Sequence, residues 1–368
     1  MSQPLQPRRS RSRSMHPTTG AASEQPGGTQ VVRLAIAVAA LLCLIVASVA
    51  LGSVWLSPTK VIGVLFRSTG GDPVARTIVW SVRLPRTFTA LCAGSALATS
   101  GLLMQTLFRN PLADSAVLGV SAGASLGVAL VVLGSSNSLI SIGRFEGAGA
   151  FGVTAAAAAG SAAVLLIVLS IAHRVGSPVI VLVAGLMVAT MVGAFVSVLM
   201  YFSSLDAARS FSVWSLGSFR GTSWREVAVL AGATIAGLGA AWFLSKSLDG
   251  LLLGDRYSAS LGMNLRAVRI LTIASAALLT GATTAFCGPI GFLGLAVPHF
   301  ARAVVRTGRH RSLIVATALI GAATALACEL VAQWPGDDRV LPINAVTALV
   351  GAPVVLWVLI RRRPMGSQ

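Results

Sequence analysis

The chain has 368 residues, of which 55% are hydrophobic and only 11% are charged, and its mean hydropathy is +0.82. An ordinary soluble domain carries about 25% charged residues, so this composition excludes a water-soluble fold and predicts an all-α protein that crosses a membrane several times. The formal net charge of +17 lies in short stretches between apolar segments. A membrane surface with anionic lipids therefore suits this charge better than nucleic acid does.

The first 30 residues are polar and rich in arginine, serine, proline and glycine, so they cannot bury a core. They predict a disordered basic cytoplasmic tail, 1–30, to which no function is assigned. The apolar run 31–56 is longer than the core of a signal peptide and can cross the roughly 30 Å of bilayer hydrocarbon. It begins a predicted transmembrane domain, 31–363, which leaves 364–368 as a short cytoplasmic C-terminal tail.

Apolar stretches of this kind recur along the chain and predict about ten transmembrane helices. They lie at 31–56, 83–107, 115–134, 146–171, 178–202, 225–245, 268–287, 290–305, 311–333 and 341–360. The least typical is 290–305, because it is short and holds Pro298 and His299. With both termini in the cytoplasm, most of the 28 Lys and Arg residues fall on the cytoplasmic side, as the positive-inside rule expects.

Small residues recur at an offset of 187 positions around the second and seventh predicted helices. The pairs are Gly94 with Gly281, Gly101 with Gly288 and Pro111 with Pro298. The seventh helix comes five positions after the second, and because five is odd the two copies would face opposite ways across the membrane. The pattern predicts an inverted internal repeat with a transport pathway between its halves. Coincidence in a glycine-rich chain is the alternative.

The second predicted helix has a distinctive residue pattern at each end. Arg83 and Arg86 flank Pro85 at the expected outer mouth. Either they reach lipid headgroups, or they pair with carboxylates of a soluble protein outside the membrane. At the inner end, Asn110 and Pro111 are expected to break the helix, because proline lacks an N–H and disfavours helical geometry in the residue before it.

The longest predicted cytoplasmic connection is 246–269, which is polar but holds apolar residues at 251–253 and Leu261. Gly254 and Gly262 interrupt it. Two short helices joined by a glycine turn would place these leucines on one face. The loop either packs on its own membrane domain or docks a cytoplasmic partner.

The segment 287–302 is interrupted by Gly288, Pro289 and Gly291. Irregular backbone at membrane depth is tolerated only where protein or a water-filled cavity covers it, so the segment predicts a re-entry that lines a pathway. His299 has no partner ligands nearby in the sequence. A hydrogen-bonded structural histidine is therefore favoured over a metal ligand.

Several functional signatures are missing from the sequence. Apart from Glu146 and Glu226 at the very start of two spans, the predicted spans hold Glu329 as their only acid, near an outer end, whereas ion-coupled transporters usually bury ionisable groups at mid-membrane. No GxxxxGK[ST] motif, metal-ligand set or nucleophile–base pair is present, so neither a metal, a cofactor nor an enzymatic activity is expected of this chain. An importer of this kind must take its energy from a partner; an ion-coupled transporter and a membrane-embedded enzyme are the alternatives.

Five segments together resemble the FecCD family of ABC-transporter permeases, which import iron siderophores, haem or vitamin B12 in bacteria. They are RLPR (83–86), SGLLMQTLFRNPLADSAVLGVSAG (100–123), LLLGDRYSASLG (251–262), GPIGFLGLAVPHFAR (288–302) and TALVGAPVVLWVLIRR (347–362). The resemblance covers nearly everything from residue 31 onward. It implies the fold of a type II ABC importer permease, in the bacterial cytoplasmic membrane.

The resemblance also implies partners and contact residues. The partners are a second permease copy or paralogue, a cytoplasmic ATPase dimer that binds the ATP, and an extracytoplasmic substrate-binding protein. Carried over as the ATPase-coupling element are Gly254, Asp255, Ala259, Leu261 and Gly262. Arg83 and Arg86 are carried over as docking residues for the binding protein, but where some relatives have a further arginine this chain has Gln333.

A set of residues in the matching segments is expected to line the pathway or its gate. These are Gln105, Asn110, Pro111, Trp214, Gly288, Pro289, Gly291, Pro298 and His299. Trp214 begins the stretch 214–224, which resembles the family's external region near the gate. The expected function is the import of an iron(III)-siderophore, with vitamin B12 or haem as the alternative cargo.

Overall fold

The computed structural model describes residues 27–51, 63–64, 73–134, 149–175, 177–333 and 340–361, and within these ranges every regular element is a helix. The predicted all-α class is therefore confirmed. Residues 1–26 and 362–368 lie outside the described residues, and with them most of the N-terminal tail and the whole C-terminal tail. The N-terminal boundary was wrong, because helix α1 begins at Gly27 and includes the last four residues of the predicted tail.

Ten described helices correspond to the ten predicted spans. They are α1 (Gly27–Ala50), α4 (Leu84–Leu107), α5 (Val120–Val132), α6 (Gly149–Arg174), α7 (Pro178–Tyr201), α9 (Trp224–Phe243), α12 (Leu265–Cys287), α13 (Leu293–Val305), α14 (His310–Ala332) and α15 (Ile343–Arg361). Seven of the segments are long and apolar enough to cross a membrane, while α5, α13 and α15 contribute shorter apolar stretches. The prediction of about ten membrane helices is therefore confirmed as seven long spans and three shorter apolar helices.

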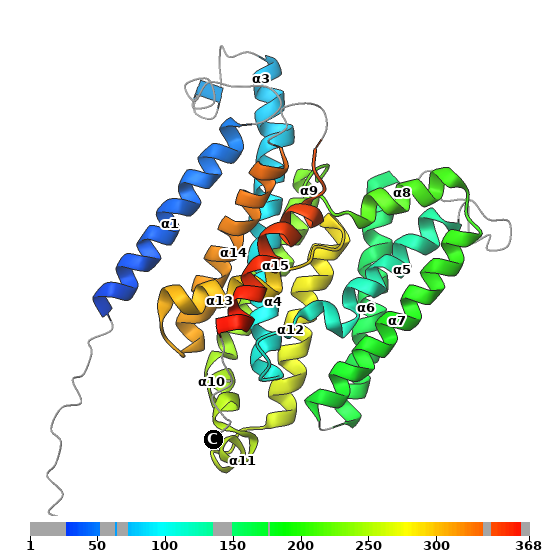
Figure 1. Ribbon diagram of the computed structural model, residues 1–368. Helices are drawn as coiled ribbons and strands as arrows, with labels where there is room; N and C mark the ends of the chain where they lie inside the picture. The colour runs from blue at the N-terminus through cyan, green and yellow to red at the C-terminus, as the bar shows by residue number, and fades with distance from the viewer. Residues whose placement is uncertain are drawn as a thin grey trace, which may run out of the picture.

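The remaining described elements are short. They are α3 (Pro73–Thr77), the π-helix η1 (Ile78–Arg83), the 3-10 helix η2 (Ser115–Leu118), α8 (Leu205–Ser215), α10 (Ser245–Leu253) and α11 (Asp255–Ser260). Because α3, η1 and α4 follow without interruption, the second span runs over 35 residues, Pro73–Leu107, and begins ten residues before its predicted start. In Figure 1, α3 lies at one end of the bundle and α10 and α11 at the other.

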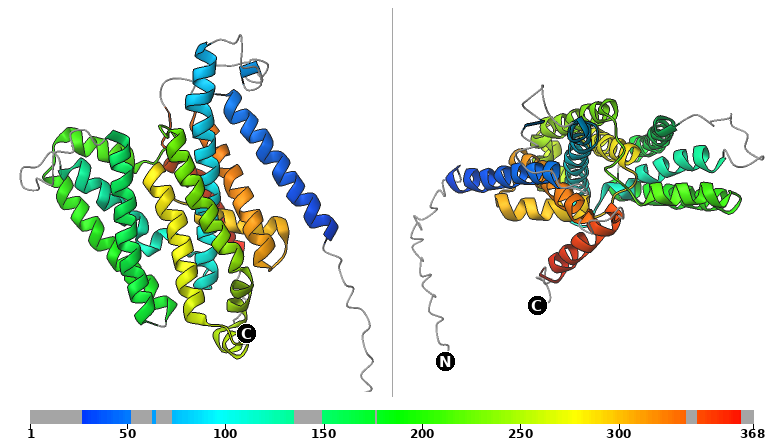
Figure 2. Two further views of the ribbon diagram at one scale, coloured as in Figure 1. Left: turned by 180° about the vertical axis from the view of Figure 1, so that it is seen from behind. Right: turned by 90° about the horizontal axis from the view of Figure 1, so that it is seen from above.

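Helix α4 lies at the centre of the helical bundle. In the most apolar stretch of the span Pro73–Leu107, 78% of the residues are buried. In the corresponding stretch of α1, which lies at the edge of the bundle (Figures 1 and 2), only 6% are buried. Helix α4 contacts α9, α12, α13 and α14. A Cβ added at Gly94 would overlap the backbone of Gly321 on α14, and one at Gly101 would overlap Gly294 on α13. Glycine at these positions therefore lets the helix backbones touch.

The two halves of the chain repeat the same order of elements. Each of α4 and α12 is followed by a break and then by a helix of 13 residues, α5 and α13 respectively. Helix α4 packs on α14, and α12 packs on α6. The C-terminal end of α4 and the N-terminal end of α12 meet at Asp255, which binds Arg109 and Arg269. The two central helices are therefore antiparallel, as an inverted repeat requires.

The residue pairs that suggested the repeat are nevertheless wrong. Gly101 lies inside α4, whereas Gly288 follows the end of α12. Pro111 lies in a turn, whereas Pro298 lies inside α13. The connecting segments differ in length between the halves, so no single offset aligns all the equivalent helices.

Candidate functional site

The predicted coupling loop folds as two short helices, α10 and α11, joined at Gly254. Gly254 has a φ of 107° and Gly262 one of 79°, both in the region that favours glycine. The predicted pair of helices with a glycine turn is confirmed. Among the residues carried over from the family, Ala259, Leu261 and Gly262 are exposed, while Gly254 and Asp255 are half-buried.

The leucines of this loop do not all share one face, as the sequence suggested. Leu251 is buried in the main hydrophobic core together with Leu248. Leu252, Leu253 and Leu261 are 50%, 65% and 67% exposed. The loop therefore packs on its own membrane domain through one side of α10 and presents apolar side chains on the other. Packing on its own membrane domain is thus confirmed for α10, and docking of a cytoplasmic partner stays a prediction.

Asp255 connects the loop to the inner ends of two membrane helices. Its carboxylate accepts hydrogen bonds of 2.7 Å from the guanidinium groups of Arg109, just after α4, and Arg269, in the first turns of α12. Arg109 has a φ of 47° and also donates from Nε to the carbonyl of Leu251. The Asp255 side chain remains 47% exposed, so these ion pairs lie in contact with solvent.

The interrupted segment between α12 and α13 is covered by protein on two sides. Gly288, with a φ of 73°, leaves no room for a Cβ beside the carbonyl of Trp214. The backbone N–H of Ser218 donates to the carbonyl of Cys287 at 2.8 Å. The structure thus brings Trp214, Gly288, Pro289 and Gly291 into one region, next to the stretch that precedes α9.

Asn344, in the first turn of α15, completes this region and was not predicted from the sequence. Its Nδ2 donates to the carbonyl of Pro289 at 2.7 Å, and its Oδ1 accepts from the N–H of Gly291 at 2.8 Å. One amide side chain thus satisfies both the donor and the acceptor of an irregular backbone. The sequence did offer one indication of its role, because Asn344 is an isolated amide side chain inside the otherwise apolar span 341–360.

The other expected pathway residues lie together where α13 meets the end of α4. Gln105 donates from Nε2 to the carbonyl of Leu295 at 3.2 Å, and its Oε1 accepts from Arg302 at 2.7 Å. His299 donates from Nε2 to the carbonyl of Pro111 at 3.0 Å. This contact agrees with the interpretation of His299 as a structural, hydrogen-bonded histidine.

The helix break at the end of α4 lies at the predicted end of the second span. Helix α4 ends at Leu107, before Asn110 and Pro111, and the side chain of Asn110 accepts from the N–H of Leu112 at 3.0 Å. Pro298 is buried inside α13. The nine expected pathway residues therefore form two groups, one before α13 and one along it, instead of a single cluster.

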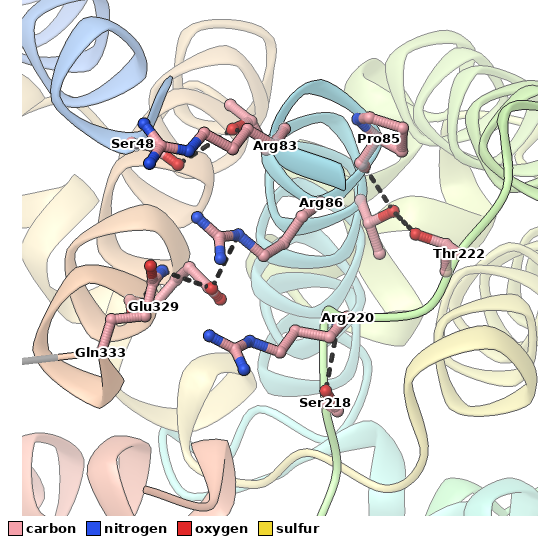
Figure 3. Close-up of polar contacts among 11 residues, drawn as sticks. Ser48, Arg83, Pro85, Arg86, Ser218, Arg220, Thr222, Glu329 and Gln333 are labelled. Atoms are coloured by element: carbon pink, nitrogen blue, oxygen red, sulfur yellow. Dashed lines mark hydrogen bonds and ion pairs between the residues drawn. The ribbon is translucent and has the colours of Figure 1, made fainter. Parts of the chain in front are cut away.

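The arginines at the outer end of α4 are buried, and Figure 3 shows Arg86 directed toward Glu329. Arg83 donates to the carbonyls of Val49 and Ala50, at 2.7 and 2.8 Å, and so satisfies the C-terminal end of α1. Arg86 forms an ion pair with Glu329 of α14, with 3.1 Å between Nε and Oε1, and both side chains are only 5% exposed. Gln333 donates to the same Glu329 oxygen at 2.6 Å.

The expectation that Arg83 and Arg86 present their guanidinium groups to the outside is therefore wrong for this chain. Each already serves an internal partner. Arg220, which the sequence analysis did not single out, is exposed. Its side chain extends toward Glu329 (Figure 3).

With this geometry established, comparison with known proteins identifies the family. The model of the FecCD transport family matches residues 40–361, which is most of the chain. The chain belongs to the FecCD transport family. It is accordingly an ABC importer permease and a multi-pass membrane protein, not an ion-coupled transporter.

Relatives of this FecCD permease agree along nearly their whole length. The vitamin B12 import system permease protein BtuC of Escherichia coli (strain HS) is 35% identical over 333 residues, which cover 90% of this chain and 95% of the relative. BtuC of Citrobacter koseri is 34% identical over 326 residues, covering 88% and 92%. A solved chain described as a metal-chelate type ABC transporter in an inward-facing conformation matches with a TM-score of 0.77 and 28% identity, covering 90% of this chain and 99% of that chain.

Proposed function

We propose that this FecCD permease carries a metal chelate across the bacterial cytoplasmic membrane and that a separate cytoplasmic ATPase subunit supplies the energy. In this proposal the chain performs no chemistry, both termini lie in the cytoplasm, and a second permease copy or paralogue completes the pathway. An extracytoplasmic binding protein delivers the cargo, and the exposed Arg220 offers it a cation at the outer end of the bundle.

The observation that carries the proposal is the free surface of the α10–α11 hairpin. Leu252, Leu253 and Leu261 are exposed together with Tyr257, which is 53% exposed, at one end of the bundle. Exposed apolar side chains on a polar segment are typical of a protein interface. The same hairpin is held to α4 and α12 through Asp255. Movement of a partner docked here would therefore act directly on the central helices.

Two cargo classes remain candidates. Ferric siderophores are the candidate that the family resemblance favoured. The two relatives described above are named for vitamin B12, which favours cobalamin as the second candidate. Both cargoes are metal chelates, in keeping with the description of the matching solved transporter.

The test is uptake of a radiolabelled ferric siderophore and of labelled cobalamin by cells that lack this chain. Cells are rescued with wild type or with Gly262→Asp, which forces a side chain into a φ of 79° on the exposed hairpin. Gly239→Ala is the matched control, because a Cβ there meets open space in a helix. We expect uptake of one cargo to be lost, and wild type and the control to restore it.

Each other outcome contradicts a different part of the proposal. If Gly262→Asp restores uptake as well as wild type does, the hairpin is not the coupling element. If neither cargo is affected by loss of the chain, the cargo is neither a siderophore nor cobalamin.

A further inference from the structure

Three side chains join α10 to the inner ends of α4 and α14. Asp249 lies on α10, His310 is the first residue of α14, and Thr106 lies in the last turn of α4. The distance from His310 Nδ1 to Asp249 Oδ1 is 2.6 Å, and that from His310 Nε2 to Thr106 Oγ1 is 2.9 Å. One imidazole thus bridges three helices that are far apart in the sequence.

The chemistry of the groups fixes how this bridge is made. A carboxylate only accepts hydrogen bonds, so Nδ1 carries the proton that it donates to Asp249. The same Asp249 oxygen accepts from the backbone N–H of His310 at 2.9 Å. It thereby caps the start of α14, where the residue at the N-cap position, Arg309, makes no side-chain cap. The His310 side chain is only 2% exposed, whereas the Asp249 side chain is 40% exposed, so the imidazole is shielded from water and the carboxylate is partly solvated.

Helices α4 and α14 are in turn joined along their whole length. At the outer end Arg86 pairs with Glu329. In the middle, Gly94 and Gly321 bring the two backbones into contact, and Ser95 donates to a carbonyl of α14 at 3.0 Å. The two helices therefore form one packed pair from the inner to the outer end, and close-packed interiors transmit displacement without much compression.

The attachment of α11 is of a different kind. It depends on the ion pairs of Asp255, in which both the Asp255 and Arg109 side chains are nearly half exposed. Such pairs are screened and contribute little to holding a geometry. Helix α10, in contrast, buries Leu248 and Leu251 and holds His310 through Asp249. The firm connection between the hairpin and the bundle is thus at α10.

We propose that His310 is a positioning residue that makes α10 move together with the α4–α14 pair during transport. This inference rests on the proposed function, because it takes a cytoplasmic partner to displace α10. Without the imidazole the hairpin still folds and still presents its exposed leucines, but its displacement is no longer passed on to the central helices. Loss of the bridge is then a loss of coupling between ATP hydrolysis and import.

The test uses the whole transporter, purified through a tag on the permease and reconstituted in vesicles with its binding protein. The variants are His310→Ala and Asp249→Ala, which break the bridge, and Asp249→Asn, which keeps an acceptor oxygen. Ser312→Ala is the matched control, because Ser312 is exposed and lies two residues after His310 on the same helix. Three quantities are measured: uptake of labelled siderophore and cobalamin, ATP hydrolysis, and the amount of ATPase subunit that copurifies.

We expect His310→Ala and Asp249→Ala to lower the amount of cargo imported per ATP by about tenfold, the equivalent of one hydrogen bond to a charged group. The copurified ATPase should be unchanged. Asp249→Asn and Ser312→Ala should stay close to wild type. A purely structural role would lower import only in proportion to the loss of assembled complex, with an unchanged ratio of cargo to ATP.

An unchanged ratio in His310→Ala, or a ratio lowered equally by Ser312→Ala, overturns the inference. A wild-type complex that copurifies no ATPase, or that imports neither cargo with ATP, overturns the proposed function instead, and the inference with it. The two failures are therefore distinguishable from the wild-type measurement alone.

Discussion

The two ends of this permease hold arginine–carboxylate pairs of similar geometry in different surroundings. At the outer end, Arg86 and Glu329 are 3.1 Å apart and each 5% exposed. At the inner end, Arg109 and Asp255 are 2.7 Å apart and 46% and 47% exposed. A buried pair cannot lose one partner without leaving an uncompensated charge, whereas an exposed pair can exchange its partner for water. The same chemistry thus fixes α4 to α14 at the outer end and holds α11 only weakly at the inner end.

The largest effect is expected at the buried pair. Glu329→Ala leaves the Arg86 guanidinium charged and buried, so we expect the free energy of unfolding to fall by about 3–5 kcal/mol. Denaturant unfolding of the purified permease in detergent measures this change.

A double substitution serves as the control for that prediction. Arg86→Met with Glu329→Met removes both charges and fills similar volume, so most of the lost stability should return. If the double variant is as unstable as Glu329→Ala, then lost packing, and not the unpaired charge of Arg86, accounts for the lower free energy of unfolding.

A smaller effect is expected at the interrupted segment. Asn344→Ala leaves the N–H of Gly291 and the carbonyl of Pro289 without their amide partner, which should lower the free energy of unfolding by about 2 kcal/mol. Asn344→Asp keeps the acceptor for Gly291 but turns a second acceptor oxygen toward the carbonyl of Pro289, so it should lose at least as much as Asn344→Ala. The same unfolding measurement compares the two variants, and a smaller loss in Asn344→Asp would contradict the role of the Nδ2 donor.

The smallest effect is expected at the exposed pair. Asp255→Asn should change the free energy of unfolding by less than about 1 kcal/mol, because solvent and salt already screen its two arginines. Unfolding at low and high salt is the measurement, and the small difference from wild type should shrink further at high salt. A loss as large as that of Glu329→Ala would contradict the comparison between the two ends.

The apolar segments and the two breaks beside α5 and α13 could be predicted from the sequence, since both depend on local composition. The turn at Gly254 belongs to the same class, because a glycine between two amphipathic pieces is a local signal. The helix boundaries were less accurate: α1 and the second span both begin earlier than expected. Polar residues at a helix end in a membrane can be helical without adding to the apolar signal, so composition alone placed these starts too late.

By itself, the sequence determined that this protein is a helical membrane permease of the FecCD family. The apolar composition, the lengths of the apolar spans and the family motifs are all properties of continuous stretches of sequence. Only the tertiary structure decided which arginines are buried against an internal partner and which are exposed. From the sequence, Arg86 was expected to be an outward-facing docking residue. In the structure it pairs with Glu329, on a helix far away in the sequence. The same holds for His310 and Asn344, whose partners lie on other helices. Such contacts depend on how antiparallel helices pack, and no local pattern encodes which side chains meet across them.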